Sequence, residues 1–318
     1  MEDKDSLHRV SIIIPTKNEE DVLEDCLESI ISQSVQPLET IIVDGGSTDK
    51  TLEISKRFHA RVVIEERSSS PANARNLGVE KAGGDILLVL DADTLLARNC
   101  LEQATKAFDD KNVIAVLPSQ LEEDHSYLEL IQRKWTDGSR TSMSVGVRKA
   151  KTSGFVMFFR KEVFVKTKFD TKYGFGEDDD FSVRLEKTFD AGRIVVSSDC
   201  KVISHSPHTL KELATRYMWW GRTFPTYFAK HINFRSTINA VSLLFPALLT
   251  IGLGFSIFFP QIRLVFIILS SLFGARILTV CFRSKSTLFF QFALFDIARS
   301  FLFVAGLARS PFLRKRGR

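Results

Sequence analysis

The sequence predicts an α/β domain, built on a mostly parallel sheet with helices on both faces, followed by an apolar membrane module. Short apolar runs such as Val10–Ile14, Thr40–Val43 and Ile86–Leu90 alternate with segments of helical period, which is typical of βαβ units. From Ile238 to Ala308, long apolar stretches dominate. The chain therefore divides into a soluble first part and an apolar second part.

The elements of the first part follow from this periodicity in chain order. Strands are expected over residues 10–14, 40–44, 61–65, 86–90, 112–117 and 154–160, and helices over 19–33, 51–58, 71–82 and 125–135. The helix at 71–82 has Ser70 as its N-cap and Pro71 at its first position. Residues 136–151 are polar, basic and glycine-containing, so we expect a mobile loop over a site. Parallel strands bring their carboxyl ends to one edge, where Asp44 is also expected.

Two carboxylates follow the buried strand at 86–90 without a break. Asp91 and Asp93 are two residues apart, so in extended chain they project to the same side, and Ala92 leaves room for a ligand. Hard oxygen donors at this spacing suit a divalent cation that carries a phosphorylated substrate. The alternative is that Asp-x-Asp begins a loop and helps to cap the following helix. His205, after a short apolar strand, is either a structural histidine or a metal ligand.

Four consecutive acids at 177–180 open a predicted helix. Phe181, Leu185 and Phe189 recur every four residues after them, which places the acids at the helix N-terminus. The helix dipole stabilises carboxylates there by about 0.3 to 1 kcal/mol without any catalytic role. Four acids exceed what capping requires, however, and like charges this close raise the pKa of at least one of them. Such a residue is suited to accept a proton, so we predict a catalytic role for one of the four.

The charge balance and the cysteines exclude several classes of protein. The 318 residues carry a formal net charge of +5, but the first part shows no basic stripe interleaved with aromatic residues, so we expect no nucleic-acid binding. The basic C-terminal tail fits anionic lipid headgroups, with a solvated tail as the alternative. Four cysteines without pairing or metal-type spacing fit a reducing compartment. The apolar run at 10–15 is too short for a signal-peptide core, so the first part is expected to be cytoplasmic.

The second part is expected to attach the chain to a membrane. Residues 209–231 combine tryptophan and tyrosine with arginine, which is typical of an interfacial helix; an ordinary surface helix with a packed aromatic face is the alternative. Residues 238–259 contain no charge, and residues 264–282 contain only Arg276, so both are long and apolar enough to cross a bilayer as a hairpin.

A third apolar segment, at 287–308, leaves the number of spans open. Asp296 and Arg299 lie near its middle, three residues apart and able to pair. The segment either crosses the membrane with a buried ion pair, or lies along or re-enters the membrane and leaves the basic tail inside. Two and three spans therefore both remain open.

Five motifs occur together and in order, at residues 10–19 (VSIIIPTKNE), 42–49 (IVDGGSTD), 74–78 (ARNLG), 91–93 (DAD) and 176–180 (GEDDD). This set resembles the family 2 glycosyltransferases with the GT-A fold, a Rossmann-like, mostly parallel sheet with helices on both faces. The likeness extends from the first strand to about Arg222. One departure is Gly45, where many relatives carry a second aspartate, and this leaves the base of the nucleotide open.

The resemblance implies a metal-dependent, inverting transfer of a hexosyl-type sugar from a UDP- or GDP-linked donor, with Mg²⁺ or Mn²⁺ as cofactor. Asp91 and Asp93, and by resemblance His205, would hold the metal on the diphosphate, and Asp178 would be the general base. Asp44 would contact the nucleoside, and Arg75 the diphosphate or uracil. The full set of implied donor-binding residues is Pro15, Thr16, Asn18, Glu19, Asp44, Arg75, Asp91 and Arg222.

The membrane module narrows the expected acceptor to a molecule at the bilayer surface, such as a polyprenyl phosphate, a lipid-linked saccharide or a membrane lipid. Since a phosphate is already ionised, Asp178 would then position the acceptor and not deprotonate it. We predict a cytoplasmic catalytic domain at 1–208, an interfacial helix or linker at 209–235 and a multi-pass membrane module at 236–318. A processive polysaccharide synthase and a catalytically silent, membrane-anchored nucleotide-sugar-binding protein are the alternatives, and the oligomeric state is open.

Overall fold

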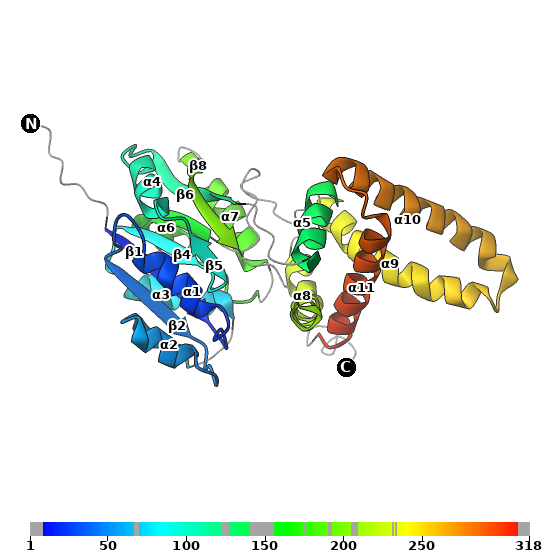
Figure 1. Ribbon diagram of the computed structural model, residues 1–318, viewed down its shortest axis with the longest axis horizontal. Coiled ribbons are helices and arrows are strands. Elements are labelled where there is room, and N and C mark those ends of the chain that lie inside the picture. The colour runs from blue at the N-terminus through cyan, green and yellow to red at the C-terminus, as the bar shows by residue number, and fades with distance from the viewer. Residues whose placement is uncertain are drawn as a thin grey trace, which may run out of the picture. The chain divides into compact units, whose positions relative to one another are not determined.

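The chain folds into two compact units, each described here by itself. A computed structural model describes residues 9–66, 70–121, 127–139, 156–173, 176–189, 193–204, 209–230, 232 and 234–310 (Figure 1). The first unit comprises Met1–Glu123 and Ser144–His205, and the second comprises Asp124–Met143 and Ser206–Arg318. The segment 124–143, which the sequence analysis kept within the first domain, thus groups with the C-terminal helices.

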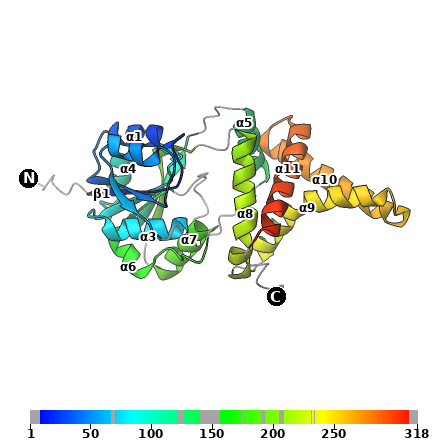
Figure 2. The same ribbon diagram turned by 90° about the horizontal axis from the view of Figure 1, so that it is seen from below.

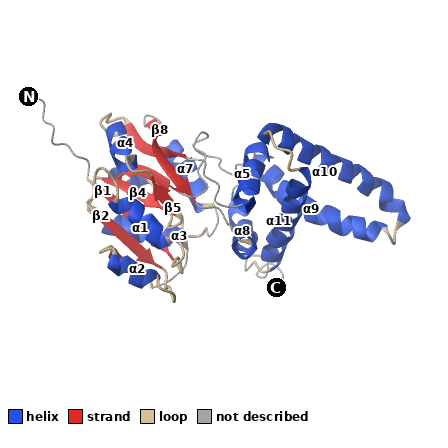
Figure 3. Cartoon of the chain, in the orientation of Figure 1, coloured by secondary structure: helices blue, strands red, loops and turns tan. Residues whose placement is uncertain are grey.

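The first unit is built on one mixed sheet of eight strands, drawn in red in Figure 3, in the order β3-β2-β1-β4-β7-β6-β8-β5. The strands β3, β2, β1 and β4 run parallel, whereas β7 is antiparallel to both of its neighbours. The strands are β1 (Val10–Thr16), β2 (Glu39–Asp44), β3 (Arg61–Ile64), β4 (Ile86–Leu90), β5 (Thr94–Leu96), β6 (Val113–Gln120), β7 (Val156–Arg160) and β8 (Arg193–Ser204).

Helices cover both faces of this sheet, as the sequence predicted. They are α1 (Leu23–Ile31), α2 (Thr51–Arg57), α3 (Pro71–Lys81), α4 (Cys100–Ala107), α6 (Lys161–Lys166) and α7 (Glu177–Thr188). Alternate residues of β1 point to opposite faces, so Ile12 and Ile14 pack with α1 and α4, whereas Ile13 packs with α3 and α7. Because β4 is buried on both faces, all five of its residues are apolar.

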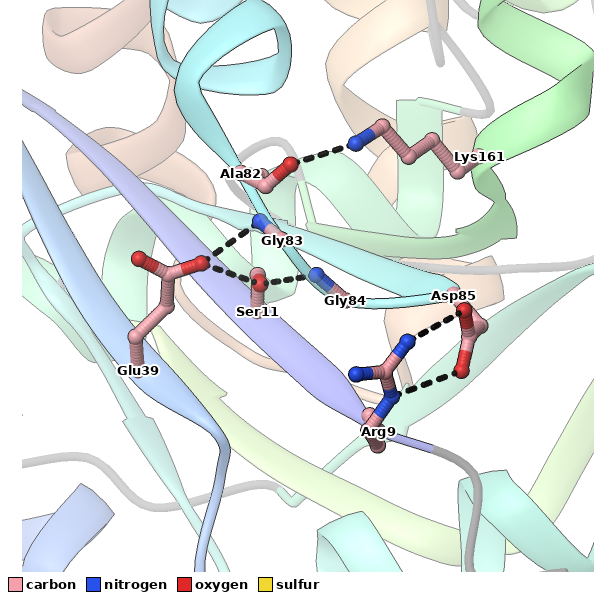
Figure 4. Close-up of polar contacts among 8 residues, drawn as sticks. All are labelled: Arg9, Ser11, Glu39, Ala82, Gly83, Gly84, Asp85 and Lys161. Atoms are coloured by element: carbon pink, nitrogen blue, oxygen red, sulfur yellow. Dashed lines mark hydrogen bonds and ion pairs between the residues drawn. The ribbon is translucent and has the colours of Figure 1, made fainter.

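A polar cluster fixes the amino edge of this sheet, away from the strand ends that carry the acidic motifs (Figure 4). The Glu39 carboxylate accepts hydrogen bonds from the Gly83 N–H at 2.7 Å and from the Ser11 hydroxyl at 2.9 Å. The Ser11 hydroxyl in turn accepts one from the Gly84 N–H. A Cβ at Gly84 would lie 2.6 Å from the Arg9 carbonyl oxygen, so the passage from α3 into β4 requires glycine there.

Three elements of the first unit differ from the sequence expectation. The short strand β5 and the helix α6 were not predicted, and β8 is twelve residues long where only its end was expected. The helix α5 (Tyr127–Ser139), in the second unit, continues through residues 136–139, where a loop was expected. The rest of that expected loop, from 140 to 151, lies outside the described residues.

The second unit is helical. Besides α5 it contains α8 (Leu210–Lys230), α9 (Phe234–Ser256), the short helix η1 (Pro260–Ile262), α10 (Arg263–Ser284) and α11 (Phe289–Ala308). By length and composition, α10 and α11 could each cross a membrane, and α9 has a shorter apolar stretch, Ala240–Ser256. These helices correspond to the three apolar segments of the sequence analysis, and they support membrane association only weakly.

Two glycines let α8 and α11 pack with their backbones in close approach. A Cβ at Gly221 would lie 1.9 Å from the Phe303 carbonyl oxygen, and a Cβ at Gly306 would lie 2.0 Å from the Met218 carbonyl oxygen. Since both obstacles are backbone atoms, no side-chain rotation can relieve them. The crossing of α8 and α11 therefore depends on small residues at these two positions.

We expect Gly221→Ala to destabilise the second unit by about 1 to 3 kcal/mol, because the added methyl group forces the two backbones apart. The matched control is Gly274→Ala on α10, where a Cβ would meet no atom within 4 Å. Thermal unfolding of the detergent-solubilised chain measures both variants. Equal midpoints for the two variants would contradict the close helix crossing.

Candidate active site

Three parallel strands bring their carboxyl ends together at one edge of the first unit. Thr16 at the end of β1 is in register with Asp44 at the end of β2, and Asp91 directly follows β4, the other neighbour of β1. The sequence prediction that Asp44 and Asp91 both lie at the carboxyl ends of strands of the parallel sheet is therefore confirmed. In open α/β sheets this edge is where ligands bind.

Asp44 is fully buried and shapes the turn that follows β2. One carboxylate oxygen accepts hydrogen bonds from the backbone N–H groups of Gly46 and Ser47, both at 2.9 Å, and the other accepts from the Ser47 hydroxyl. Gly46 has a φ of 82°, a conformation that favours glycine. A contact of Asp44 with a nucleoside remains a prediction.

The loop after β1 is tied to this turn through Asn18, which is exposed and also has a positive φ, of 59°. Its side-chain oxygen accepts a hydrogen bond from the Thr48 N–H at 2.8 Å, and its own N–H donates to the Ser47 hydroxyl at 2.9 Å. The Glu19 N–H donates to the Thr51 hydroxyl at 2.8 Å. Pro15 and Glu19 are half-buried and Thr16 is buried. The four residues predicted from the first motif thus line one side of this edge.

One buried arginine joins the two acidic motifs. The Arg75 guanidinium donates from Nη2 to Asp91 Oδ1 at 2.8 Å and from Nη1 to Glu177 Oε1 at 2.6 Å. The Arg75 side chain is 5% exposed, and its guanidinium carbon lies 5.7 Å from the centre of the Phe169 ring. A contact of Arg75 with the diphosphate or uracil remains a prediction. The pairing of Glu177 with this arginine is not predicted by the sequence.

Local sequence explains why Arg75 reaches both acids. The Ser70 hydroxyl caps α3 by accepting a hydrogen bond from the Asn73 N–H. One turn after Arg75, a Cβ at Gly78 would lie 2.3 Å from Ile13 Cγ2 on β1, so glycine lets α3 approach the sheet closely. This approach holds Arg75 beside the end of β4.

The acids of α7 have different environments. Gly176, with a φ of 75°, precedes the helix. Glu177 is buried against Arg75, and Asp180 is buried and accepts a hydrogen bond from Arg184 Nε at 2.7 Å. Asp178 is half-buried. The Asp179 side chain lies outside the described residues. Among the described acids of this turn, Asp178 is therefore the one most accessible to a substrate.

Asp91 and Asp93 fit a divalent cation that also binds a phosphorylated ligand. Both are half-buried, at the end of β4, and Mg²⁺ commonly uses one or two carboxylates together with substrate phosphates. The described residues contain no group of three or more histidine, cysteine or acidic side chains arranged to hold a metal. His205 lies outside the described residues, and Ser204 just before it is in register with Thr94, the neighbour of Asp93. All three metal assignments remain predictions.

Comparison with known proteins relates part of the chain, including most of the first unit, to a family. Residues 11–167 match the family model described as Glycosyl transferase family 2. These residues form a family 2 glycosyltransferase domain. Glycosyltransferase GlyG of Streptococcus pneumoniae is 30% identical to the chain over 122 residues, which are 37% of this chain and 40% of GlyG. The chain spans 40% or less of the length of the first curated relatives it matches.

Solved structures share the GT-A fold of this glycosyltransferase domain. The mannosyltransferase PcManGT from Pyrobaculum calidifontis, in complex with GDP-Man and Mn²⁺, superposes with a TM-score of 0.60 at 21% identity over 93% of this chain and 87% of its own. Glucosyl-3-phosphoglycerate synthase from Mycobacterium tuberculosis, in complex with Mn²⁺ and UDP, gives a TM-score of 0.51 at 19% identity over 70% of this chain and 78% of its own. The fold that the resemblance implied is confirmed.

Arg222, the remaining predicted site residue, lies on α8 in the second unit and not in the glycosyltransferase domain. Its side chain is exposed. Its assignment to the diphosphate or the acceptor remains a prediction.

Burial and ion pairing raise the pKa values of both Glu177 and Arg75 in the first unit, which disfavours the charge of the glutamate and favours that of the arginine. Burial raises the pKa of Glu177 from its ordinary 4.5 to about 7, although the Arg75 guanidinium opposes this shift. Burial alone would lower the pKa of Arg75, but the carboxylates of Asp91 and Glu177 outweigh it and raise that pKa. Arg75 is therefore a permanent cation beside a glutamate that titrates near neutral pH.

A double-mutant cycle tests the Arg75 to Glu177 pair. We expect Arg75→Met to cost about 3 to 5 kcal/mol of unfolding free energy, because it leaves the buried Glu177 and the half-buried Asp91 without their counter-charge. Adding Glu177→Gln should restore at least about 1 kcal/mol of that loss. The control cycle uses the exposed pair Lys168 and Glu80, whose coupling should stay within about 1 kcal/mol. Additive effects at Arg75 and Glu177 would contradict the pairing.

The raised pKa of Glu177 predicts a pH dependence of stability in the metal-free protein. Between pH 4.5 and about 7 the folded state holds a proton that the unfolded state has released, so this group stabilises the fold below pH 4.5 and loses that effect as pH rises through 7. Relative to Glu177→Gln, the wild type should lose on the order of 3 kcal/mol across this window. Denaturant unfolding in the presence of a chelator measures both.

The matched control for this pH profile is Glu186→Gln, an exposed glutamate on the same helix. The unfolding free energy of Glu186→Gln should differ from that of the wild type by the same amount at every pH. A constant difference between wild type and Glu177→Gln from pH 4.5 to 8 would exclude Glu177 as the titrating group.

Proposed function

We propose that the chain is an inverting glycosyltransferase that moves a sugar from a UDP- or GDP-linked donor to an acceptor at a membrane surface. The observation that carries this proposal is the link through Arg75 between the end of β4 and the start of α7. It joins the carboxylates suited to a donor's metal to the turn that carries a half-buried acid, Asp178. An enzyme that transfers between two substrates needs both groups at a fixed spacing.

The donor would bind at the carboxyl edge of β1, β2 and β4. Thr16 ends β1, Asp44 ends β2 and Asn18 lies in the loop after β1, so these are the groups we assign to the nucleoside end. Asp91 and Asp93 would hold Mg²⁺ or Mn²⁺, and His205 is a further ligand in this proposal. A divalent cation bound there supplies positive charge that offsets the negative charge developing on the leaving nucleoside diphosphate. The GDP-Man and UDP complexes of the two structural neighbours support a nucleotide donor without choosing between the bases.

Asp178 is assigned the role of general base. Its carboxylate would take the proton of the acceptor hydroxyl while the acceptor oxygen attacks the anomeric carbon and the bond to the diphosphate breaks on the opposite side. Attack from the opposite side inverts the configuration at that carbon. Glu177 and Asp180 are buried in ion pairs, which supports Asp178 over either of them. With a phosphate acceptor, Asp178 would orient the acceptor and take no proton.

A membrane-surface acceptor is supported by the second unit. Its helices α10 and α11 pass the length and composition test for a span, and α8 carries tryptophans, tyrosines and arginines together. We infer that this unit attaches the enzyme to a membrane, with the catalytic domain in the cytoplasm. The acceptor would then be a polyprenyl phosphate, a lipid-linked saccharide or a membrane lipid, because these are presented where the enzyme is held.

The first experiment is nucleotide release. The full chain in detergent with Mn²⁺ and a panel of nucleotide sugars should slowly liberate UDP or GDP even without an acceptor, and faster after cell-membrane lipids are added. Mass analysis of the lipid products would then identify the acceptor. Absence of release under both conditions would refute the proposed activity and favour a nucleotide-sugar-binding role.

Substitutions separate the proposed roles of the acids. Asp178→Asn should lower transfer to a hydroxyl acceptor by about 10²- to 10⁴-fold while donor affinity is retained. Asp91→Ala or Asp93→Ala should instead weaken Mn²⁺-dependent donor binding, measured by calorimetry. Glu186→Gln on the same helix is the control for loss of a nearby negative charge. Equal loss of donor binding in all three site variants would contradict this division of roles.

A further inference from the structure

A buried polar cluster joins four helices of the second unit, and we call it the polar seam: Trp135 on α5, Pro246 on α9, Arg276 on α10, and Asp296, Arg299 and Ser300 on α11. Asp296 is fully buried. It accepts a hydrogen bond from Arg299 Nε at 2.6 Å and lies 3.3 Å from Arg276 Nη2. The Trp135 ring packs against both arginines, with guanidinium carbons 5.3 Å and 5.1 Å from the ring centre.

The polar seam also replaces backbone hydrogen bonds that α9 lacks near Pro246. Pro246 has no N–H, so the Ser242 carbonyl loses its helical partner, and Arg276 Nη1 donates to that carbonyl at 3.2 Å. The Ser300 hydroxyl donates to the Leu243 carbonyl at 2.6 Å and accepts from the Ala247 N–H at 3.0 Å. Side chains of α10 and α11 thus supply the bonds that α9 lacks at this point. The seam is a fixed joint of the unit.

Beyond the polar seam, α9 and α10 form an apolar hairpin that runs past the ends of the other helices of this unit (Figures 1 and 2). Large apolar side chains along it are exposed, from Leu248 to Leu272, and Phe258 near the tip is 78% exposed. The charge nearest the tip is Arg263. Its guanidinium donates to the carbonyls of Ser256 and Ile257, both at 3.0 Å, so it is already hydrogen-bonded and caps the end of α9.

Helix α11 is apolar in composition, like the hairpin helices α9 and α10, but it lies in a different environment. Its buried face carries Asp296, Arg299 and Ser300, all within the polar seam. The helix packs along α8 through Gly221 and Gly306, and α8 exposes Lys211, Glu212, Arg222 and Lys230. A helix covered by such a charged partner cannot lie in hydrocarbon without drawing those charges in as well. Its buried apolar residues, among them Phe292 and Phe303, pack inside the helical unit, whereas Phe290 and Leu294 near its start are exposed.

We propose that the α9–α10 hairpin beyond the polar seam is the part of the chain that enters the bilayer, that it enters one side without crossing, and that α11 does not span. This proposal rests on the membrane attachment inferred under the proposed function. From Ala247 to the end of α9, and from Arg263 to Arg276, the hairpin arms are about 15 to 20 Å long at 1.5 Å per residue. A hydrocarbon core is about 30 Å thick, so the hairpin is too short to cross it.

The occupant of this apolar surface is lipid, and a second copy of the chain is the rival. A protein partner would cover one face of the hairpin, whereas the exposed residues lie on both helices and around the tip. The hairpin is also free of acidic residues from Ala247 to Arg276. The α9–α10 hairpin is apolar and has the polar seam at its base, so it is suited to insert into a bilayer up to the level of the seam.

Cysteine labelling in sealed membrane vesicles of either orientation tests the topology of the full chain. In a Cys281→Ala background, whose remaining cysteines are buried, single cysteines replace the exposed residues Gln261 at the tip, Thr287 before α11 and Arg309 after it. With a membrane-impermeant maleimide, Thr287→Cys and Arg309→Cys should react from the same side, and Gln261→Cys should react only after detergent is added.

Each other labelling result overturns part of the proposal. Reaction of Thr287→Cys and Arg309→Cys from opposite sides would show that α11 spans. Reaction of Gln261→Cys from the side opposite to Thr287→Cys would show that the hairpin crosses. Reaction of Gln261→Cys from the same side as Thr287→Cys would show that the tip lies outside the membrane, as it would in a dimer formed through the hairpin.

Vesicle flotation gives a second measurement that is independent of the topology. Ile268→Glu, at a half-exposed hairpin position, should lower binding to phosphatidylcholine and phosphatidylglycerol vesicles by about 10-fold or more. Val165→Glu, at a more exposed apolar position on α6, is the control and should bind as the wild type does. Equal binding of both variants would refute insertion. Nucleotide release, measured in parallel, tests the proposed activity separately, because neither variant touches its residues.

Discussion

The first unit depends on one buried cation. Arg75 is the counter-charge of both Asp91 and Glu177, so a single side chain fixes the end of β4 relative to the start of α7. The buried carboxylate of Glu177 and the half-buried one of Asp91 would be costly without it, because burial removes hydration from a charged group. Phe169 stacks on Phe181 with 4.2 Å between ring centres, and this apolar layer beside Arg75 strengthens the buried pair with Glu177, whereas Asp91 keeps 27% of its side chain exposed. The residue after β4 and the turn that carries Asp178 are therefore held by the same side chain.

Sequence patterns predicted the central sheet well because its strands are short apolar runs that follow each other in βαβ order. They could not predict the direction of β7, since the residues of a buried strand do not encode whether its neighbours are parallel. The three residues of β5 are too few to show a period. The helix α5 was expected, but its membership in the second unit was not, because that depends on Trp135 packing against distant arginines.

Within the candidate site, too, local sequence predicts some features, whereas others depend on contacts between distant residues. Strand ends placed Asp44 and Asp91 correctly at one edge, but four consecutive acids look alike in a sequence. The helix α7 gives these acids different environments. Glu177 and Asp180 are three residues apart and share the buried face with Phe181, whereas Asp178 is turned away from that face. That spacing was available as a signal. The partner of Glu177 was not, because Arg75 lies about a hundred residues earlier and meets it only through the fold.

The second unit shows why hydropathy alone does not decide which helices enter a membrane. Both α10 and α11 are apolar enough to span, yet 17% of the apolar window of α10 is buried within the structure, against 39% for α11. The difference arises from partners: α11 has α8 along its length and a polar seam at its centre, whereas the outer part of α10 has only α9. The buried face of α11 thus packs against protein, and its polar residues belong to the seam at the base of the α9–α10 hairpin. The level of the seam therefore sets how far the hairpin reaches into the bilayer.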